Sequence, residues 1–313
     1  MEVLSTPKRG FERRNIHLVH PLFQSLICLE ISRNWRSVQK WLSRQTYSLD
    51  EIRIGSNFPR AIKGINFQVH IAKKAFIEGT SDWVVKTDIS RFYPAIYTHS
   101  IPWAAYGKEN VKKQMTQYNG SLADRLDALI RGCNRNQTVG IPIGPETSRI
   151  IAETISSRID REFSAIINNL RKVPGIRREC TDRLQDDWFV GVQRLEDAEF
   201  VLSAISEAYR EYGLEINGSK TSINRVLETP GSRWIGEIGA FLSHRPGPIR
   251  GARLRELLAL CLRLQIKFTN EPIITYVLSV VEGNPLANDD VEIVESFLLK
   301  AAIVSPIAMD RIC

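Results

Sequence analysis

The stretch Arg183-Leu184-Gln185-Asp186-Asp187-Trp188-Phe189-Val190 places two adjacent carboxylates between apolar segments. We interpret residues 183–193 as two short strands with the acids at the turn between them. Almost a hundred residues upstream, Asp88 follows a second apolar run, 83–87, that also predicts a strand. Carboxylate oxygens are the ligands that Mg²⁺ takes from proteins. The sequence therefore predicts one acidic site, built from two distant segments, that suits two Mg²⁺ ions and in-line nucleotidyl transfer.

The composition is that of a globular protein. The chain has 313 residues, of which 43% are hydrophobic and 25% charged. Its 42 Lys and Arg against 35 Asp and Glu give a net charge of +7, which suits a polyanionic partner and ordinary solubility about equally. The five cysteines form no CxxC motif, so we expect reduced thiols. No apolar run approaches the about 18 residues of a membrane span and none resembles a signal peptide, so we expect a cytoplasmic protein without membrane segments.

The order of predicted elements is strand, helix, hairpin, helix and strand, which indicates an α+β fold with helices on one face of an antiparallel sheet. The central helix begins near Pro145 and carries an apolar stripe to Leu170. The remaining predictions are helices within 22–31, 103–133 and 197–212, strands at 214–217 and 234–242, and a helical region from about 251 to the end.

Four motifs in this order resemble those of reverse transcriptases. Asp88 to Tyr93 resembles motif A, Gly140 to Gly144 motif B, Gln185 to Asp187 motif C and Leu214 to Lys220 motif D, so the resemblance covers roughly residues 50–242. The runs Ile89 to Trp103 and Gly140 to Arg149 are similar to the bacterial abortive-infection (Abi) branch and its phage-defence relatives.

This resemblance implies an architecture and an activity. The expected domains are a fingers region at 1–82, a palm at 83–245 that includes inserted fingers helices at about 103–133, and a helical region at 246–313 that begins a longer helical domain. Characterised members of the branch resemble protein-primed, template-independent DNA polymerases that use dNTPs with Mg²⁺. The resemblance also implies a homo-oligomer that acts in antiviral defence.

The resemblance further implies a role for each candidate site residue. Asp88 and Asp186 would bridge both Mg²⁺ ions, and Asp187 would assist them. Tyr93 would place its ring beneath the sugar and select dNTPs, and Gly144 would let the backbone approach the nucleotide closely. Arg60 would contact the triphosphate, and Lys220 would lie near the pyrophosphate. From the residues alone, Tyr93 fits a core aromatic equally well, Gly144 a plain turn, and Lys220 a surface lysine.

Two positions depart from the reverse-transcriptase pattern. Leu184 stands where most members have an aromatic residue, and Ile143 where motif B usually has Gln. Both departures weaken the case for copying an RNA or DNA template into a DNA product. The alternatives are a templated RNA-directed DNA polymerase of the retron or group II intron kind, and a catalytically inactive palm that only binds nucleic acid.

Overall fold

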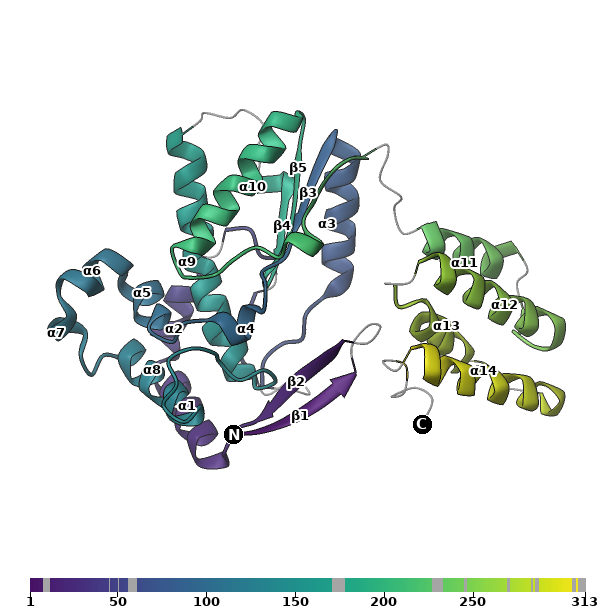
Figure 1. Cartoon of the computed structure of the whole chain (residues 1–313), viewed down its shortest axis with the longest axis horizontal. Helices are drawn as coiled ribbons and strands as arrows, with labels where there is room; N and C mark the ends of the chain where they lie inside the picture. The colour runs from purple at the N-terminus through teal and green to yellow at the C-terminus, as the bar shows by residue number, and fades with distance from the viewer. Residues whose placement is uncertain are drawn as a thin grey trace. The chain divides into compact units, whose positions relative to one another are not determined.

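The computed structural model describes residues 1–7, 12–44, 46–49, 51–55, 61–170, 178–226, 233–244, 247–268, 271–282, 284, 287–305 and 308. The chain divides into two compact units, drawn in Figure 1. The first comprises Met1–Val3 and Ile16–Thr229, and the second comprises Leu4–Asn15 and Pro230–Cys313. In the described part of the chain, no helix is long and apolar enough to cross a membrane.

The first unit contains a four-stranded antiparallel sheet with strand order β4-β5-β3-β6. Its strands are β3 (Trp83–Thr87), β4 (Thr181–Leu184), β5 (Asp187–Val192) and β6 (Ser222–Arg225). The prediction of two strands around the acidic turn is confirmed, because β4 and β5 form a hairpin in which Leu184 pairs with Asp187. At the outer edge of β4, Ser48 forms a parallel bridge with Arg183. A separate two-stranded sheet joins β1 (Glu2–Pro7) and β2 (Arg13–Leu18).

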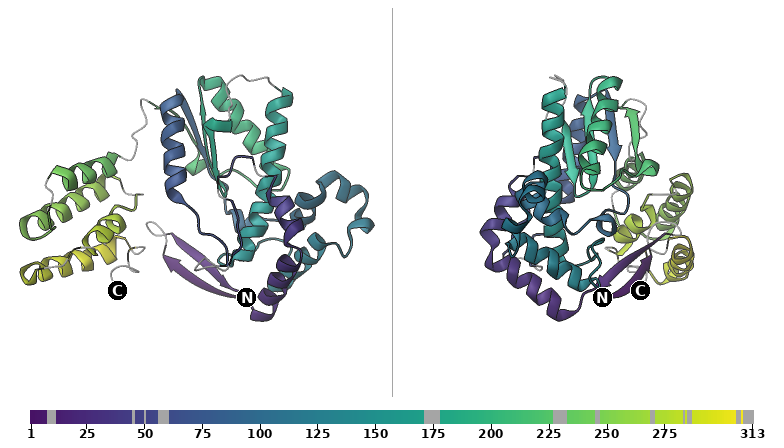
Figure 2. Two further views of the ribbon diagram at one scale, coloured as in Figure 1. Left: turned by 180° about the vertical axis from the view of Figure 1, so that it is seen from behind. Right: turned by 60° about the vertical axis from the view of Figure 1, so that its left-hand side comes forward.

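Helices cover both faces of the four-stranded sheet, so the prediction of helices on one face is wrong. Trp188, Val190 and Val192 of β5 share the main core with α9 (Glu146–Leu170) and α10 (Leu195–Arg210). On the opposite face, Val84 and Phe189 pack against Ile77 of α3 (Phe67–Thr80). Figures 1 and 2 show α3 on one side of the strands, with α9 and α10 on the other. The second face needs a helix because its side chains are also apolar.

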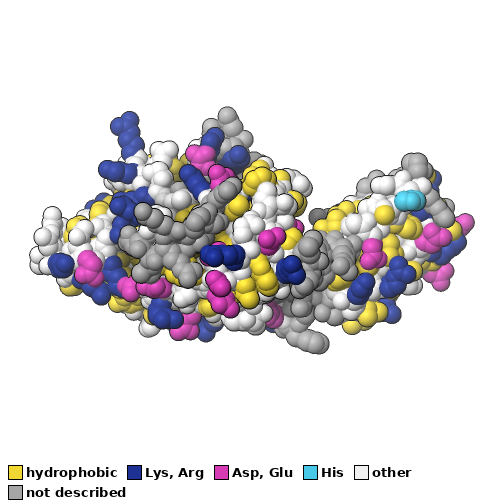
Figure 3. Space-filling model, turned by 90° about the horizontal axis from the view of Figure 1, so that it is seen from above, with side chains coloured by type: hydrophobic (Ala, Val, Ile, Leu, Met, Phe, Trp, Pro, Cys, Tyr) yellow, Lys and Arg dark blue, Asp and Glu magenta, His cyan; other side chains and the backbone are white. Residues whose placement is uncertain are grey.

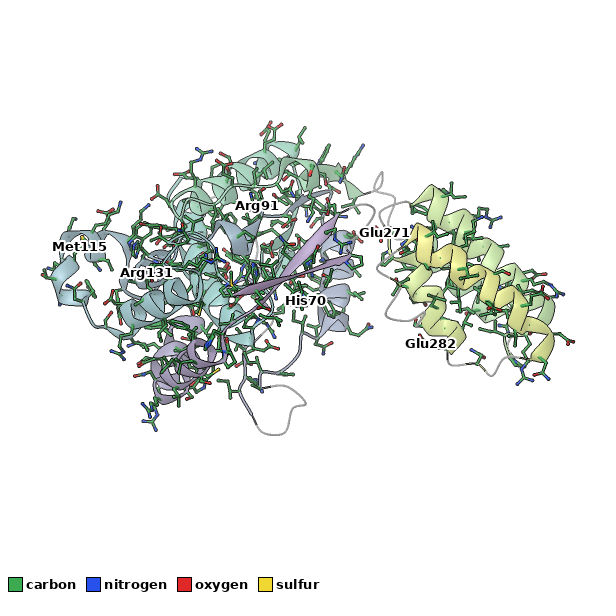
Figure 4. All side chains as sticks on the ribbon, turned by 60° about the horizontal axis from the view of Figure 1, so that its bottom comes forward. His70, Arg91, Met115, Arg131, Glu271 and Glu282 are labelled. Carbon is green, nitrogen blue, oxygen red and sulfur yellow. The ribbon has the colours of Figure 1, made fainter. Side chains whose placement is uncertain are left out.

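A buried hydrogen-bonded pair attaches α3 to the sheet. His70 of α3, labelled in Figure 4, lies with its Nδ1 atom 2.9 and 3.0 Å from the two carboxylate oxygens of Asp182 on β4. Both side chains are buried. Pairing and hydrogen bonding lower the free-energy cost of burying the charge of a carboxylate.

The helices predicted within 22–31 and 103–133 are present. The first is α1 (Pro21–Arg33), and the second comprises α5 (Ser100–Tyr106), α6 (Lys108–Lys113), α7 (Met115–Tyr118) and α8 (Leu122–Cys133). The helices α2 (Trp35–Leu42) and α4 (Phe92–Ala95) were not predicted. Gly120, between α7 and α8, has a φ of 69°. Buried residues of α1, α2, α5 and α8 belong to the same core as α9.

The predicted strand at 234–242 is wrong, because this segment is helix α11 (Arg233–His244). Trp234 and Ile238 lie four positions apart, which places them on one face of a helix, and both are buried in the second unit's core. That core also contains α12 (Gly251–Lys267), α13 (Ile273–Glu282) and α14 (Val291–Val304), as predicted for the helical region from 251. Residues 214–217 also differ from prediction: they form one bridge, Ile89 to Ile216, and no strand.

Gly191 lets α3 approach β5 closely, which leads to a first prediction. A Cβ atom at Gly191 would lie 2.5 Å from Ile77 Cγ2 and 2.2 Å from Ser81 Oγ. We expect Gly191→Ala to lower the free energy of unfolding by about 1–3 kcal/mol, because α3 must move away from the sheet. The measurement is urea unfolding. Gly79→Ala on α3 is the control, since a Cβ there has no neighbour within 4 Å; equal stability of the two variants would contradict the prediction.

Candidate active site

The three predicted carboxylates lie together at one end of the central strands. Asp88 directly follows β3, and the β3–β5 register, in which Thr87 pairs with Trp188, directs it toward Asp187 at the start of β5. Asp186 precedes Asp187 in the hairpin turn, and its carboxyl group lies near enough to that of Asp88 for Asp88 to raise its pKa, in addition to the larger effect of burial. Asp88 is buried, Asp186 is half-buried and Asp187 is exposed. Two segments almost a hundred residues apart therefore supply one acidic site.

The hairpin turn has an unusual backbone. Gln185 has a φ of 58°, in the left-handed region that non-glycine residues rarely adopt. A tight two-residue hairpin requires such a conformation, which Asn or Gly adopts more easily. Arg183 Nη1 donates a hydrogen bond of 2.7 Å to the Gln185 carbonyl oxygen. This bond holds the turn in the conformation that presents Asp186 and Asp187.

Arg183 is fully buried and ties the turn to α9. Its Nη2 atom lies 2.6 Å from Glu153 Oε1, and its Nε atom lies 2.6 Å from Asp160 Oδ1. Asp160 Oδ2 also accepts from the backbone N–H groups of Thr46 and Tyr47, at 3.0 and 3.4 Å. One guanidinium thereby joins the acidic hairpin, the long helix and the segment beside β4.

Sequence reasoning did not identify this network. Two signals were present: a charged residue within the hairpin strand, and two acids seven positions apart, which places them on one face of a helix.

The electrostatics of the three acids disfavour full ionisation. Burial raises the pKa of Asp186 well above its ordinary value, and the hydrogen bond with Asp88 and the charges of Asp187 and Asp88 add to this effect. Although Asp187 is exposed, desolvation and the charge of Asp88 raise its pKa, and Lys220 and Lys74 act in the opposite direction. A divalent cation would relieve this repulsion, so the chemistry of the donor set fits Mg²⁺. Among the described residues, however, no group of three or more His, Cys, Asp or Glu is arranged to hold a metal ion.

Lys220 lies beside the acids. Its ammonium group contacts Asp88 Oδ2, and this bond raises the pKa of Lys220. Lys220 ends a short 3₁₀ helix, Gly218–Lys220, whose preceding residue Asn217 donates its backbone N–H to the Asp88 carbonyl at 2.7 Å. The lysine side chain remains 51% exposed. Its charge is thus available to a ligand as well as to Asp88.

Tyr93 also lies near the acids. It belongs to α4, which begins after Arg91, a residue with a φ of 48°. Its carbonyl accepts a 3.0 Å hydrogen bond from Ile141 N, which joins this segment to the one before α9. Burial, followed by the charges of Asp186 and Glu153, raises the pKa of Tyr93. The ring is partly buried against the main core, so a packing role and a substrate role both remain compatible with its position.

The two other predicted nucleotide contacts have different outcomes. Gly144 has a φ of 125°, and a Cβ atom there would lie 3.1 Å from Ile16 Cγ2 of β2. Beside it, His17 N donates to the Ile143 carbonyl at 2.8 Å, and Ile143 N donates to His17 Nδ1 at 2.9 Å. The glycine therefore permits a close approach to β2. Arg60 lies outside the described residues.

Comparisons with known proteins give a distant likeness. No family model and no curated protein matches the sequence. Telomerase from Candida tropicalis in complex with a TWJ fragment of telomeric RNA is 11% identical, with a TM-score of 0.44, over 99% of this chain and 58% of that one. Apo telomerase from the same species is 12% identical, with a TM-score of 0.39, over 72% and 43%. The chain thus spans under two thirds of these proteins, and a likeness at this level establishes no shared function.

The Arg183 network predicts a large effect on stability. We expect Arg183→Met to lower the free energy of unfolding by about 3–5 kcal/mol, because Glu153 and Asp160 would remain buried without their cation. Chemical denaturation measures the change. Arg53→Met is the matched control: in its pair with Glu51 both side chains are 61% exposed, and the loss of that pair should cost under about 1 kcal/mol. Similar losses in both variants would show that the buried network does not stabilise the fold.

Proposed function

We propose that the first unit is the catalytic part of a DNA polymerase of the reverse-transcriptase kind, which adds dNMPs to a growing DNA strand. The observation that carries this proposal is the β3–β5 register, in which Thr87 pairs with Trp188 and Asp88 therefore lies at the same end of the sheet as Asp186 and Asp187. Perturbed pKa values, such as the raised pKa of Asp186 and of Asp187, cluster at functional sites. Their position at strand ends, next to Lys220 and Tyr93, supports a site for a phosphorylated substrate.

The chain's own residues would divide the work. Asp88, Asp186 and Asp187 would hold two Mg²⁺ ions, which, when bound, lower the pKa of the attacking hydroxyl and screen the triphosphate. Lys220 would place a positive charge beside the phosphates, where the leaving pyrophosphate accumulates charge. Tyr93 would lie against the sugar of the incoming nucleotide and exclude a 2′-hydroxyl.

The finer features of the activity rest on the sequence resemblance to the Abi branch. We propose that synthesis is template-independent and protein-primed, that the protein forms a homo-oligomer, and that it acts in antiviral abortive infection. Leu184 and Ile143, which stand in place of the usual aromatic and Gln, support the absence of templating. Incubation with labelled dNTPs and Mg²⁺, with and without RNA or DNA template, tests this point. Protease digestion of the product then shows whether the DNA is attached to protein.

Asp186→Asn should abolish nucleotide incorporation. We expect a loss of at least about a hundredfold, or about 2.7 kcal/mol of transition-state stabilisation, because an amide replaces one of the carboxylates that would hold the ions. The variant should unfold at the same urea concentration as the wild type or at a higher one, since the substitution keeps the shape and removes a charge that burial and the neighbouring acids disfavour. Asp88→Asn should behave in the same way, and chelation of Mg²⁺ should stop incorporation by the wild type.

The inactive-palm alternative has a different outcome. If the wild type binds oligonucleotides but incorporates no nucleotide with Mg²⁺ or Mn²⁺, the chain is a nucleic-acid-binding protein. If a folded Asp186→Asn protein incorporates nucleotides at a near-normal rate, the assignment of Asp186 as a carboxylate needed for catalysis is wrong.

Tyr93→Ala should reduce the discrimination between sugars. A ring against the sugar leaves no room for a 2′-hydroxyl, so its removal should raise the ratio of rNTP to dNTP incorporation. The readout is that ratio at matched nucleotide concentrations. Tyr93→Phe, which keeps the ring and removes the hydroxyl, is the control and should retain the wild-type ratio. An unchanged ratio in an active Tyr93→Ala enzyme would leave the tyrosine as a packing residue.

A further inference from the structure

Two lysines from different elements converge on one aromatic ring. Lys74 of α3 lies with its ammonium nitrogen 5.5 Å from the centre of the Phe189 ring, and Lys86 of β3 lies 5.2 Å from it. Both lysines are half-buried. Cation–π contacts of this length hold an ammonium group in place without neutralising it. We call Lys74, Lys86 and Phe189 the lysine pair site.

The lysine pair site lies on the same face of the sheet as two of the acids. Lys86 pairs directly with Phe189 in the β3–β5 ladder. Side chains alternate along a strand, so Asp88 shares the face of Lys86, and Asp187 shares the face of Phe189. Two residues of a strand extend about 7 Å. The lysine pair therefore lies one step along the sheet from the carboxylates proposed to hold the reacting groups.

Neither lysine forms an ion pair with a described acid, although Lys74 is near enough to Asp187 to lower the pKa of that carboxyl group. No ion pair or hydrogen bond joins Lys74 or Lys86 to a described side chain, whereas Lys220 and Lys108 contact Asp88 and Glu211. The wider surface does not explain this concentration of charge, because Lys and Arg are interspersed with Asp and Glu on the face shown in Figure 3. Two ammonium groups that lie over one ring and form no ion pair with a described acid suit an anion as ligand.

We propose that Lys74 and Lys86 form a phosphate-binding site that takes the backbone of the strand being extended. This inference rests on the proposed function, because a strand whose end reacts at the carboxylates must continue past them. Lysine contacts to backbone phosphates position a strand without reading its sequence. The same chemistry would accept the incoming triphosphate, and the experiment separates the two sources.

The test compares the full-length wild type with Lys74→Gln/Lys86→Gln. The first arm measures binding of a labelled single-stranded DNA oligonucleotide, without dNTP, over a range of salt concentrations. The second arm measures the KM for dNTP. For two lost phosphate contacts on single-stranded DNA, the slope of log K against log salt should become shallower by about 1.4. If the DNA strand is the ligand, the KM for dNTP should stay unchanged. If the triphosphate is the ligand instead, the KM for dNTP should rise and oligonucleotide binding should stay unchanged.

Two controls make the result specific. Lys267→Gln in the second unit removes a lysine held over Phe268 at 5.3 Å, a contact of the same kind. Lys74→Arg/Lys86→Arg keeps both charges and should restore binding. If Lys74→Gln/Lys86→Gln alters the salt slope and the KM for dNTP no more than Lys267→Gln does, the proposed phosphate-binding site is wrong. If the wild type incorporates no nucleotide while its oligonucleotide salt slope still depends on the pair, the proposed function fails and the phosphate site stands.

Discussion

The arrangement of the acidic site depends on one buried guanidinium. Arg183 binds Glu153 and Asp160 of α9 and the carbonyl of Gln185 in the acidic turn. Burying a cation is costly unless charged partners surround it, and here they come from a helix that also forms the main core. A hairpin tip would ordinarily be among the mobile parts of a fold. This network instead connects the tip to the most extensively packed helix of the first unit, which suits a site whose chemistry needs defined geometry.

The sheet has two faces with different roles. One face packs Val85 and Val190 against α9 and α10 in the main core. The other packs Val84 and Phe189 against α3, and its open end carries the carboxylates and the lysine pair. The close approach of α3 at Gly191 and the buried His70–Asp182 pair hold α3 in this position. The helix α3, which covers this second face of the sheet, thereby also places Lys74 at the edge of the acidic site.

Charge at the site is balanced by cations from three segments. Burial and the charges of neighbouring acids raise the pKa of Asp186 and of Asp187, and Lys220 and Lys74 oppose this effect for Asp187. Lys220 arrives from the loop before β6, Lys74 from α3 and Lys86 from β3. Such an arrangement favours ligands that combine cations with phosphate, because the acids need positive charge and the lysines need negative charge.

The sequence by itself determined the local elements: the β4–β5 hairpin, the α9 helix and the helices after 251 follow from apolar periodicity and turn residues, which act over a few positions. It also identified Asp88, Asp186 and Asp187, because strand ends deliver their acids to a common edge. Only the tertiary structure decided which distant groups meet. Arg183 with Glu153 and Asp160, Lys220 with Asp88, and α3 on the second face of the sheet join residues far apart in sequence. The segment predicted as a strand at 234–242 is the helix α11, in which Trp234 and Ile238, four positions apart, both face the core of the second unit.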